Sequence, residues 1–364
     1  DFAWEWVFLI NIPVGILAIV ATLFIVPEST DPRASRRIDW TGVLLSGIGI
    51  FAIVYALIEG NIKGWTSPLI LSLFVIGAAL LVAFVWWEMR VEDPVMKLEL
   101  FKLRNFWVGN VIAMVVAFGM LGIFFPMTLF LQGALGFSPI RAGLTMTPMS
   151  IMIMFAAPLS GRLSDKIGAR WILVTGLTLM SVGILLIITQ IDLNTNWQSL
   201  LLPLIVAGIG MGMTFAPMTA AAMREVPPRI AGSASGILNT TRNIGQVLGI
   251  AVLGSLLQSR LAANTTDQIA NVPLDPATKN QVVEIARGSQ FELLPQVVSA
   301  DLVPQVFRAV QLAFVDSLHT TFLFGAAACA VGAVSALFIR NLTAAATVPR
   351  SRETIEATVV PGAD

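Results

Sequence analysis

The stretch SGRLSDKIGARW, residues 160–171, places two glycines and four charged side chains between two long apolar runs. The glycines are Gly161 and Gly168, and the charged residues are Arg162, Asp165, Lys166 and Arg170. Glycine permits a tight turn where two helices approach closely. Basic residues hold such a connection at the cytoplasmic face of a membrane, and a carboxylate can face the amino terminus of a neighbouring helix. We therefore expect a cytoplasmic loop between two membrane spans; an ordinary positively charged turn is the alternative on this pattern alone.

The composition around this stretch is typical of a membrane protein. Of 364 residues, 56% are hydrophobic and 12% are charged, whereas soluble globular proteins carry about 25% charged residues. The net charge is zero, which argues against a nucleic-acid partner. Cys329 is the one cysteine, so an intrachain disulfide and a cysteine metal cluster are excluded. We predict no metal site and no bound cofactor.

Nine apolar runs are long enough to cross about 30 Å of hydrocarbon as helices. We place them at 6–26, 41–58, 69–87, 106–131, 142–159, 171–191, 200–223, 237–257 and 313–339. The runs are continuous, whereas the strands of a membrane barrel would alternate apolar and polar residues in shorter segments. The predicted fold is an all-α, polytopic membrane helix bundle with about nine transmembrane helices.

The lysines and arginines indicate how these spans are oriented. Sixteen of the 22 follow the first, third, fifth, seventh and ninth runs, and four of the remainder lie in the long segment 258–312. Long segments count little in the positive-inside rule. We therefore predict an integral inner-membrane protein with its amino end outside, its carboxyl end in the cytoplasm, and a disordered cytoplasmic tail over 341–364. Asp1 is not an initiator methionine, and an outside start suggests that an odd number of spans precedes it.

The segment Gly161-Arg-Leu-Ser-Asp165-Lys-Ile-Gly168-Ala-Arg170 resembles the G-x-L-x-D-x-x-G-x-[RK] loop motif of the major facilitator superfamily. Four other stretches resemble, in chain order, the fourteen-span drug:proton antiporters of that superfamily. They are Trp4-Glu-Trp6…Asn11-Ile-Pro13-Val-Gly15, Ile58-Glu59-Gly60…Gly64-Trp65, Phe130-Leu-Gln132…Gly136-Phe-Ser138-Pro139 and Val226-Pro227…Asn239-Thr-Thr-Arg242…Gly245…Gly249. One departure is Glu5, where that family usually has a basic residue between the tryptophans.

The resemblance implies that the chain holds spans six to fourteen and lacks the first five. Residues 1–27 would be the last helix of the amino-terminal bundle, and 28–105 would be two central linker spans with cytoplasmic loops. Residues 106–340 would be the carboxyl-terminal six-helix bundle, including an extracytoplasmic loop at 258–312. The tail 341–364 would follow it.

The function implied by the resemblance is multidrug efflux by drug:proton antiport. It would export small apolar or cationic compounds through the lipid membrane, with a proton gradient in place of a cofactor. Some relatives work with a periplasmic adaptor and an outer-membrane channel, although no residue of this chain demands such partners. The chain alone is expected not to transport. A truncated non-transporting protein or scaffold is the alternative, and a membrane-embedded enzyme is disfavoured because one histidine and one cysteine offer no clustered catalytic groups.

Two groups of residues are candidates for function. The resemblance gives the 161–170 motif the role of a conformational gate, with Asp165 contacting the end of the absent fifth span. A polar side chain inside the membrane is a functional hypothesis by default. The candidates for cavity lining or proton coupling are Gln132, Asn239, Arg242, Gln246, Asp316 and His319. For Arg242 the equal alternative is a side chain that reaches the headgroups, and for Asp316 and His319 the favoured alternative is an interfacial polar role.

The glycine-rich segment Gly208-Ile-Gly210-Met-Gly212 superficially resembles a nucleotide-binding loop. It lacks the final glycine spacing, a preceding strand and a downstream acidic residue. We interpret it, like Gly245 and Gly249, as a site of close helix contact.

Overall fold

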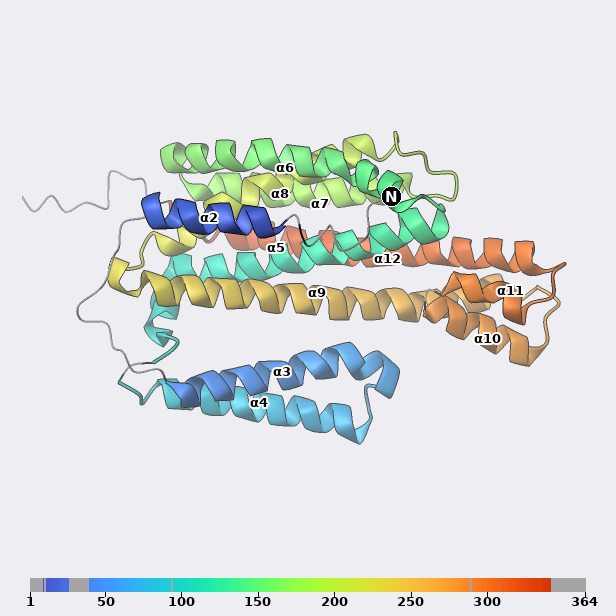
Figure 1. Ribbon diagram of the computed structural model, residues 1–364, viewed down its shortest axis with the longest axis horizontal. Coiled ribbons are helices and arrows are strands. Elements are labelled where there is room, and N and C mark those ends of the chain that lie inside the picture. Colours follow the sequence, from blue (N-terminus) through green and yellow to red (C-terminus); the bar gives the residue numbers. More distant parts are fainter. Residues whose placement is uncertain (1–8, 10, 26–38, 93, 289, 342–364) are drawn as a thin grey trace, which may run out of the picture. The chain divides into compact units, whose positions relative to one another are not determined.

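The computed structural model describes residues 9, 11–25, 39–92, 94–288 and 290–341 (Figure 1). The chain divides into two compact units, Asp1–Asp39 and Trp40–Asp364. In the first unit the described helix is α2 (Asn11–Ile25), an apolar segment of 15 residues. The predicted tail falls outside the described residues except for Asn341.

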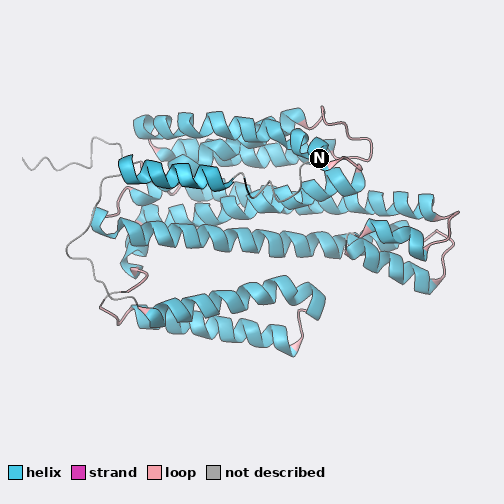
Figure 2. Cartoon of the chain, in the orientation of Figure 1, coloured by secondary structure: helices cyan, strands magenta, loops and turns pink. Residues whose placement is uncertain are grey.

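The described residues of the second unit form helices joined by loops and contain no strand (Figure 2). Its longer helices are α3 (Trp40–Lys63), α4 (Pro68–Glu88), α5 (Arg104–Leu129), α6 (Pro139–Ile167), α7 (Ala169–Gln190), α8 (Leu201–Met223), α9 (Ala231–Gln268) and α12 (Val303–Ala336). The shorter ones are η1 (Leu98–Lys102), η2 (Phe130–Ala134), η3 (Pro228–Ile230), α10 (Pro276–Arg287), η4 (Phe291–Leu293) and α11 (Leu294–Val297).

Eight of these helices are long and apolar enough to cross a membrane, which confirms the predicted fold class for the described residues. They coincide in order with the second to ninth predicted runs. The first predicted run, 6–26, lies partly outside the described residues, and α2 is shorter than a full span. The structure therefore describes eight spans against the nine predicted.

The predicted long loop at 258–312 is largely helical, and this corrects the boundaries of the last two runs. α9 continues to Gln268 and α12 begins at Val303, with α10, η4 and α11 between them (Figure 1). α9 continues past the apolar run because polar residues are compatible with a helix. The residues that most strongly disfavour one, glycine and proline, are absent from 258–268. Leu257, Leu261 and Thr265, spaced by four residues, are buried on one face of the extended helix.

The six long helices from α5 to α12 form one bundle with a pseudo-symmetric packing pattern. α5 packs against α9 and α12, while α8 packs against α6 and α7. Glycines bring α9 close to α5: Gly245 and Gly249 of α9 lie against the backbone of Met114 and Phe118 of α5. The prediction that these glycines serve close helix contact is confirmed.

The same holds for the glycine-rich segment of α8. Gly208 and Gly212 lie against the backbone of α6 at Met149 and Ile153, whereas Gly210 lies against α7. Three glycines at alternate positions therefore serve two neighbouring helices at once. Because the three glycines have this packing role, the segment need not be interpreted as a nucleotide-binding loop.

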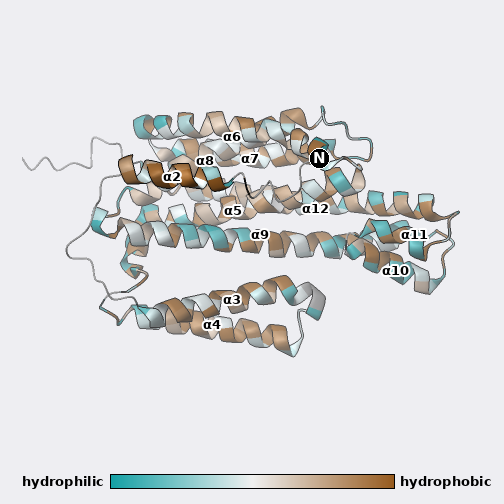
Figure 3. Cartoon of the chain, in the orientation of Figure 1, coloured by the Kyte–Doolittle hydropathy of each residue, from teal (hydrophilic) through white to brown (hydrophobic). Residues whose placement is uncertain are grey.

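Helices α3 and α4 form an antiparallel hairpin before the bundle. Gly77 of α4 lies against Ile53 of α3, and Ser67 caps α4 by accepting a hydrogen bond from the Ile70 N–H at 3.4 Å. Few of the hairpin's apolar side chains are buried, as expected for a surface in lipid. Figure 3 shows that hydrophilic residues are frequent on α9 and α10 and rarer on α3 and α4.

Candidate functional site

The connection between α6 and α7 consists of one residue, Gly168. α6 ends at Ile167, and α7 begins at Ala169. Gly168 has φ 88° and ψ 156°, and its N–H donates to the Ser164 carbonyl at 2.9 Å. This combination of angles is accessible essentially to glycine alone. The turn predicted from the two glycines is therefore made by the second of them.

The expectation that 160–171 forms a loop is wrong for most of its length. Gly161, Arg162, Asp165 and Lys166 lie in the last turns of α6, and Arg170 lies in the first turn of α7. The residues between the two glycines are compatible with a helix, so the chain has no reason to leave it before Gly168. The motif is a helix end, a one-residue turn and a helix start.

Asn341, which follows α12, holds this turn. Its Oδ1 accepts a hydrogen bond from the Arg170 N–H at 3.1 Å. Because Gly168 has no side chain to cap α7, Asn341 caps that helix from a distant part of the chain. A Cβ atom at position 168 would lie only 2.6 Å from the same Oδ1, so the contact requires glycine there.

The end of α12 is also bound to the start of α5. Asn105 is 1% exposed; its Nδ2 donates to the Arg340 carbonyl at 3.1 Å, and its Oδ1 accepts from the Arg340 N–H at 2.8 Å. The Arg104 Nε donates to the Phe338 carbonyl at 2.9 Å. We call Arg104, Asn105, Gly168 and Asn341, together with the backbone groups in these hydrogen bonds, the α12 clamp. The end of the bundle that contains it is the motif end, and the end that contains η2, α10 and α11 is the distal end.

The charges of the motif differ in their surroundings. Arg162, Asp165 and Lys166 are exposed, and no hydrogen bond or ion pair among the described residues uses their charged groups. Arg170 is half-buried, with its guanidinium 5.2 Å from the centre of the Trp171 ring. Its Nε is buried without a hydrogen-bond partner in the described structure. The motif therefore combines a fixed turn with an accessible carboxylate.

The three candidate residues of α9 lie in the half of that helix nearer the motif end. Asn239 is exposed, while Arg242 and Gln246 are half-buried, and their spacing of three and four places them on one helical face. Within the described chain the Arg242 Nε is buried and has no hydrogen-bond partner. This arrangement agrees with a polar face, but cavity lining and headgroup contact both remain predictions for it.

The other candidates lie away from the motif. Gln132 is exposed on η2, a π-helical turn that continues α5 at the distal end, where it lines a pocket. Asp316 is exposed, and the His319 Nε2 lies 3.2 Å from the Ile191 carbonyl after α7. A carbonyl only accepts, so that nitrogen carries the proton and ties α12 to α7. Proton coupling and an interfacial polar role both remain predictions for Asp316 and His319.

Sequence reasoning missed Asn105 and Asn341, the two residues that build the clamp. Their partners lie 235 and 171 positions away in the chain, so no local spacing could indicate them. The available signal for Asn105 was an amide at the start of an apolar run. Among the described residues, no three His, Cys, Asp or Glu side chains gather as a metal site.

The described helices, their apolar lengths and their packing define a polytopic integral membrane protein. A sequence model of the Major Facilitator Superfamily matches residues 1–250, so the chain belongs to this superfamily. That match includes the motif at Gly161–Arg170.

Several relatives have names that refer to drug resistance or export. The chain is 35% identical over 285 residues to the multidrug resistance protein Stp of Mycobacterium tuberculosis, covering 78% of this chain and 52% of Stp. It is 31% identical to the multidrug transporter protein MdtP of Bacillus subtilis, covering 93% and 65%. It is 28% identical to the tetracenomycin C resistance and export protein of Streptomyces glaucescens, covering 93% and 63%.

The chain thus spans about half to two thirds of the length of these relatives. Among solved structures, a bacterial homologue of the human lysosomal transporter Spinster matches with a TM-score of 0.47 and 16% identity, covering 82% of this chain and 67% of that one. A likeness at this level carries no argument about function.

Proposed function

We propose that this chain forms the carboxyl-terminal part of a drug:proton antiporter, corresponding to spans six to fourteen of a fourteen-span exporter. The names of the relatives and the four stretches that resemble the antiporter branch in chain order support the proposal. The substrates would be small apolar or cationic compounds, and a proton gradient would supply the energy. The motif end would face the cytoplasm, because most lysines and arginines of the connecting segments gather there.

Transport in this proposal belongs to a polypeptide of the relatives' length. Alternating access moves one bundle against another around a site near the membrane midplane. The bundle from α5 to α12 supplies one wall of such a cavity. An opposing bundle would supply the other wall and the partner of Asp165.

The single observation that carries the proposal is the contrast between the fixed Gly168 turn and the exposed Asp165 carboxylate. Asp165 lies one turn before Gly168, which Asn341 ties to the end of α12. A movement of α6 at this point therefore also moves α7 and α12. A carboxylate docked at a helix amino terminus favours one bundle arrangement over the other, and its release allows the exchange.

The test is Asp165→Asn in a full-length exporter that contains this chain. We expect ethidium efflux, normalised to the amount of protein in the membrane, to fall by about tenfold, since a charge at a helix terminus is worth up to about 2 kcal/mol. Asp301→Asn is the matched control, because Asp301 is also exposed but lies between α11 and α12. Unchanged efflux in Asp165→Asn, or an equal loss in Asp301→Asn, would contradict the gate.

A further inference from the structure

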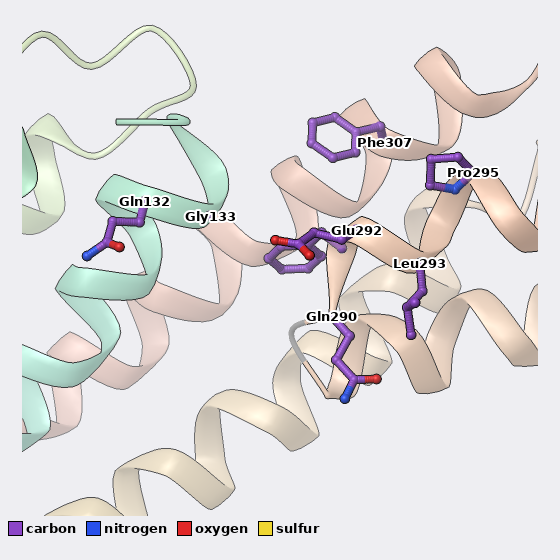
Figure 4. Close-up of a pocket in the computed structure, with 8 residues that line it drawn as sticks. Gln132, Gly133, Gln290, Glu292, Leu293, Pro295 and Phe307 are labelled. Carbon is purple, nitrogen blue, oxygen red and sulfur yellow. The ribbon is translucent and has the colours of Figure 1, made fainter. Parts of the chain in front are cut away.

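A pocket of about 710 Å³ lies at the distal end of the bundle, away from the α12 clamp (Figure 4). Its volume falls within the range of about 300–1,000 Å³ that is usual for small-molecule sites. η2 supplies Gln132 and Gly133, the segment around η4 supplies Gln290, Phe291 and Glu292, and α12 supplies Phe307. In Figure 4 the residues of η2 lie on one side of the pocket and those around η4 on the other.

The core of the bundle holds the walls of this pocket. The Phe291 ring packs edge to face against fully buried Phe314, with 5.7 Å between ring centres. The same ring lies against Gly133, where an added Cβ would be 3.4 Å from its nearest ring atom. The Gln311 Nε2 donates to the Ala134 carbonyl at 2.7 Å and so fixes η2 to α12. Both walls are therefore anchored to α12.

The charge of the lining has one sign. Glu292 is the one ionisable residue among the lining side chains. It is exposed, and within the described residues no ion pair or hydrogen bond uses its carboxylate. Near a protein surface the effective dielectric constant is about 20, so an exposed carboxylate such as Glu292 still attracts a cation more strongly than it would in bulk water.

The remaining lining adds apolar and polarisable surface to this charge. Phe291 and Phe307 are half-buried, so each retains ring surface that a ligand can contact. Aromatic faces attract cations through the ring quadrupole, and the amides of Gln132 and Gln290 can donate or accept hydrogen bonds. The geometry points to a binding site for a flat, aromatic organic cation, and it disfavours anions of the same size.

The place of this site gives it a role that rests on the proposed function. The pocket lies at the opposite end of the bundle from the motif, so in the proposed orientation it opens outside the cytoplasm. It would hold a cationic substrate on the exit side. Binding itself does not depend on transport and can be measured with the 364-residue chain.

The experiment titrates the purified chain with ethidium in nanodiscs of zwitterionic phosphatidylcholine, followed by fluorescence anisotropy with empty nanodiscs subtracted. We expect Glu292→Gln to weaken binding by about tenfold and Glu292→Asp to restore part of it. Phe307→Leu should weaken binding by about threefold, because it keeps the apolar volume and removes the aromatic face. Glu284→Gln is the matched control; Glu284 is exposed on α10 and pairs with Arg287 at 2.9 Å, outside the pocket lining.

Equal ethidium affinity of the unaltered chain and Glu292→Gln would overturn the site, and so would an equal loss in Glu284→Gln. The first outcome would place the dye elsewhere on the chain. The second would show that the loss of affinity comes from the change in the overall charge of the chain. Efflux that depends on Asp165 together with binding indifferent to Glu292 would overturn the pocket while leaving the exporter proposal intact. Binding that depends on Glu292, together with efflux that does not depend on Asp165, would support the pocket and contradict the gate.

Discussion

Both ends of the bundle have an apolar core, but their helix ends are joined in different ways. At the motif end, α5, α7 and α12 are joined by hydrogen bonds from side chains to backbone, through Asn105, Arg104 and Asn341. At the distal end the apolar core of the bundle continues into α10 and α11, with Val282 and Leu294 fully buried. Directional bonds fix one arrangement, whereas apolar packing tolerates small shifts.

This difference corresponds to the different tasks that we propose for the two ends. A gate must transmit the movement of one helix to others, which requires fixed geometry at the turn. A site for varied organic cations needs a preformed recess whose surface is partly apolar. The comparison predicts that similar substitutions should have unequal effects at the two ends.

The largest expected difference is between two glycines with positive φ. Gly168 at the motif end has φ 88° and a Cβ position 2.6 Å from Asn341, whereas Gly136 near the distal end has φ 64° and open space around its Cβ position. A left-handed backbone costs an alanine about 1–2 kcal/mol, and the more restricted region that Gly168 occupies costs about 1–3 kcal/mol. Gly168→Ala also displaces the Asn341 amide, which loses a hydrogen bond worth about 1 kcal/mol.

We therefore expect Gly168→Ala to lower the free energy of unfolding by about 3 kcal/mol and Gly136→Ala by about 1 kcal/mol. Denaturant titration of both purified variants in detergent micelles measures this difference. Equal losses would show that Asn341 does not constrain the turn.

Local sequence patterns predicted the helices well, because span length and apolar character are local properties. The runs that became α3 to α8 were placed within a few residues, apart from α6. That helix extends through the motif, because Gly168 alone breaks it. The extension of α9 was readable in principle from Leu257, Leu261 and Thr265, since an amphipathic pattern continues where the uniformly apolar one stops.

The candidate site was less accessible to sequence reasoning. The motif identified Gly168 and Asp165, but the clamp on α12 depends on contacts between residues that are far apart in the chain. Nothing near Asn105 indicates that Arg340 will lie beside it. The distal pocket likewise combines η2 with η4 and α12, which only the fold brings together.

The next comparison is between amide side chains that bind backbone groups at each end. Asn105 makes two hydrogen bonds to Arg340 at the motif end, whereas Gln311 makes one to Ala134 at the distal end. A typical hydrogen bond contributes about 1 kcal/mol. Asn105→Ala should therefore cost about 2 kcal/mol of unfolding free energy and Gln311→Ala about 1 kcal/mol.

Hydrogen exchange separates a local effect from a global one in these two variants. The Arg340 N–H should lose protection in Asn105→Ala and keep it in Gln311→Ala, when both are compared at equal global stability. A loss at Arg340 in both variants would mean that the two ends are not independently held.

The smallest expected effect depends on pH. Asp275 caps α10 at the distal end, where it accepts hydrogen bonds from the Thr278 hydroxyl at 2.6 Å and from the Thr278 N–H at 2.9 Å. These bonds lower the pKa of the Asp275 carboxyl below its ordinary value of 3.8. The ionised cap therefore stabilises α10 at pH values above 3.8, and this contribution is lost as the pH falls below that value through the lowered pKa.

Hydrogen exchange of α10, corrected for its intrinsic pH dependence, should show this loss as a decrease in protection below about pH 3.8. Asp275→Asn should remove the pH step, because an amide oxygen still accepts the backbone hydrogen bond but does not titrate. The hydrogen bonds of the α12 clamp use amide, guanidinium and backbone groups, without a carboxylate. Protection at Arg340 should therefore stay constant across the same pH range, since none of its partners gains a proton there. A matching step at Arg340 would show that acid opens the whole bundle, and the contrast between directional bonds at one end and a titrating cap at the other would fail.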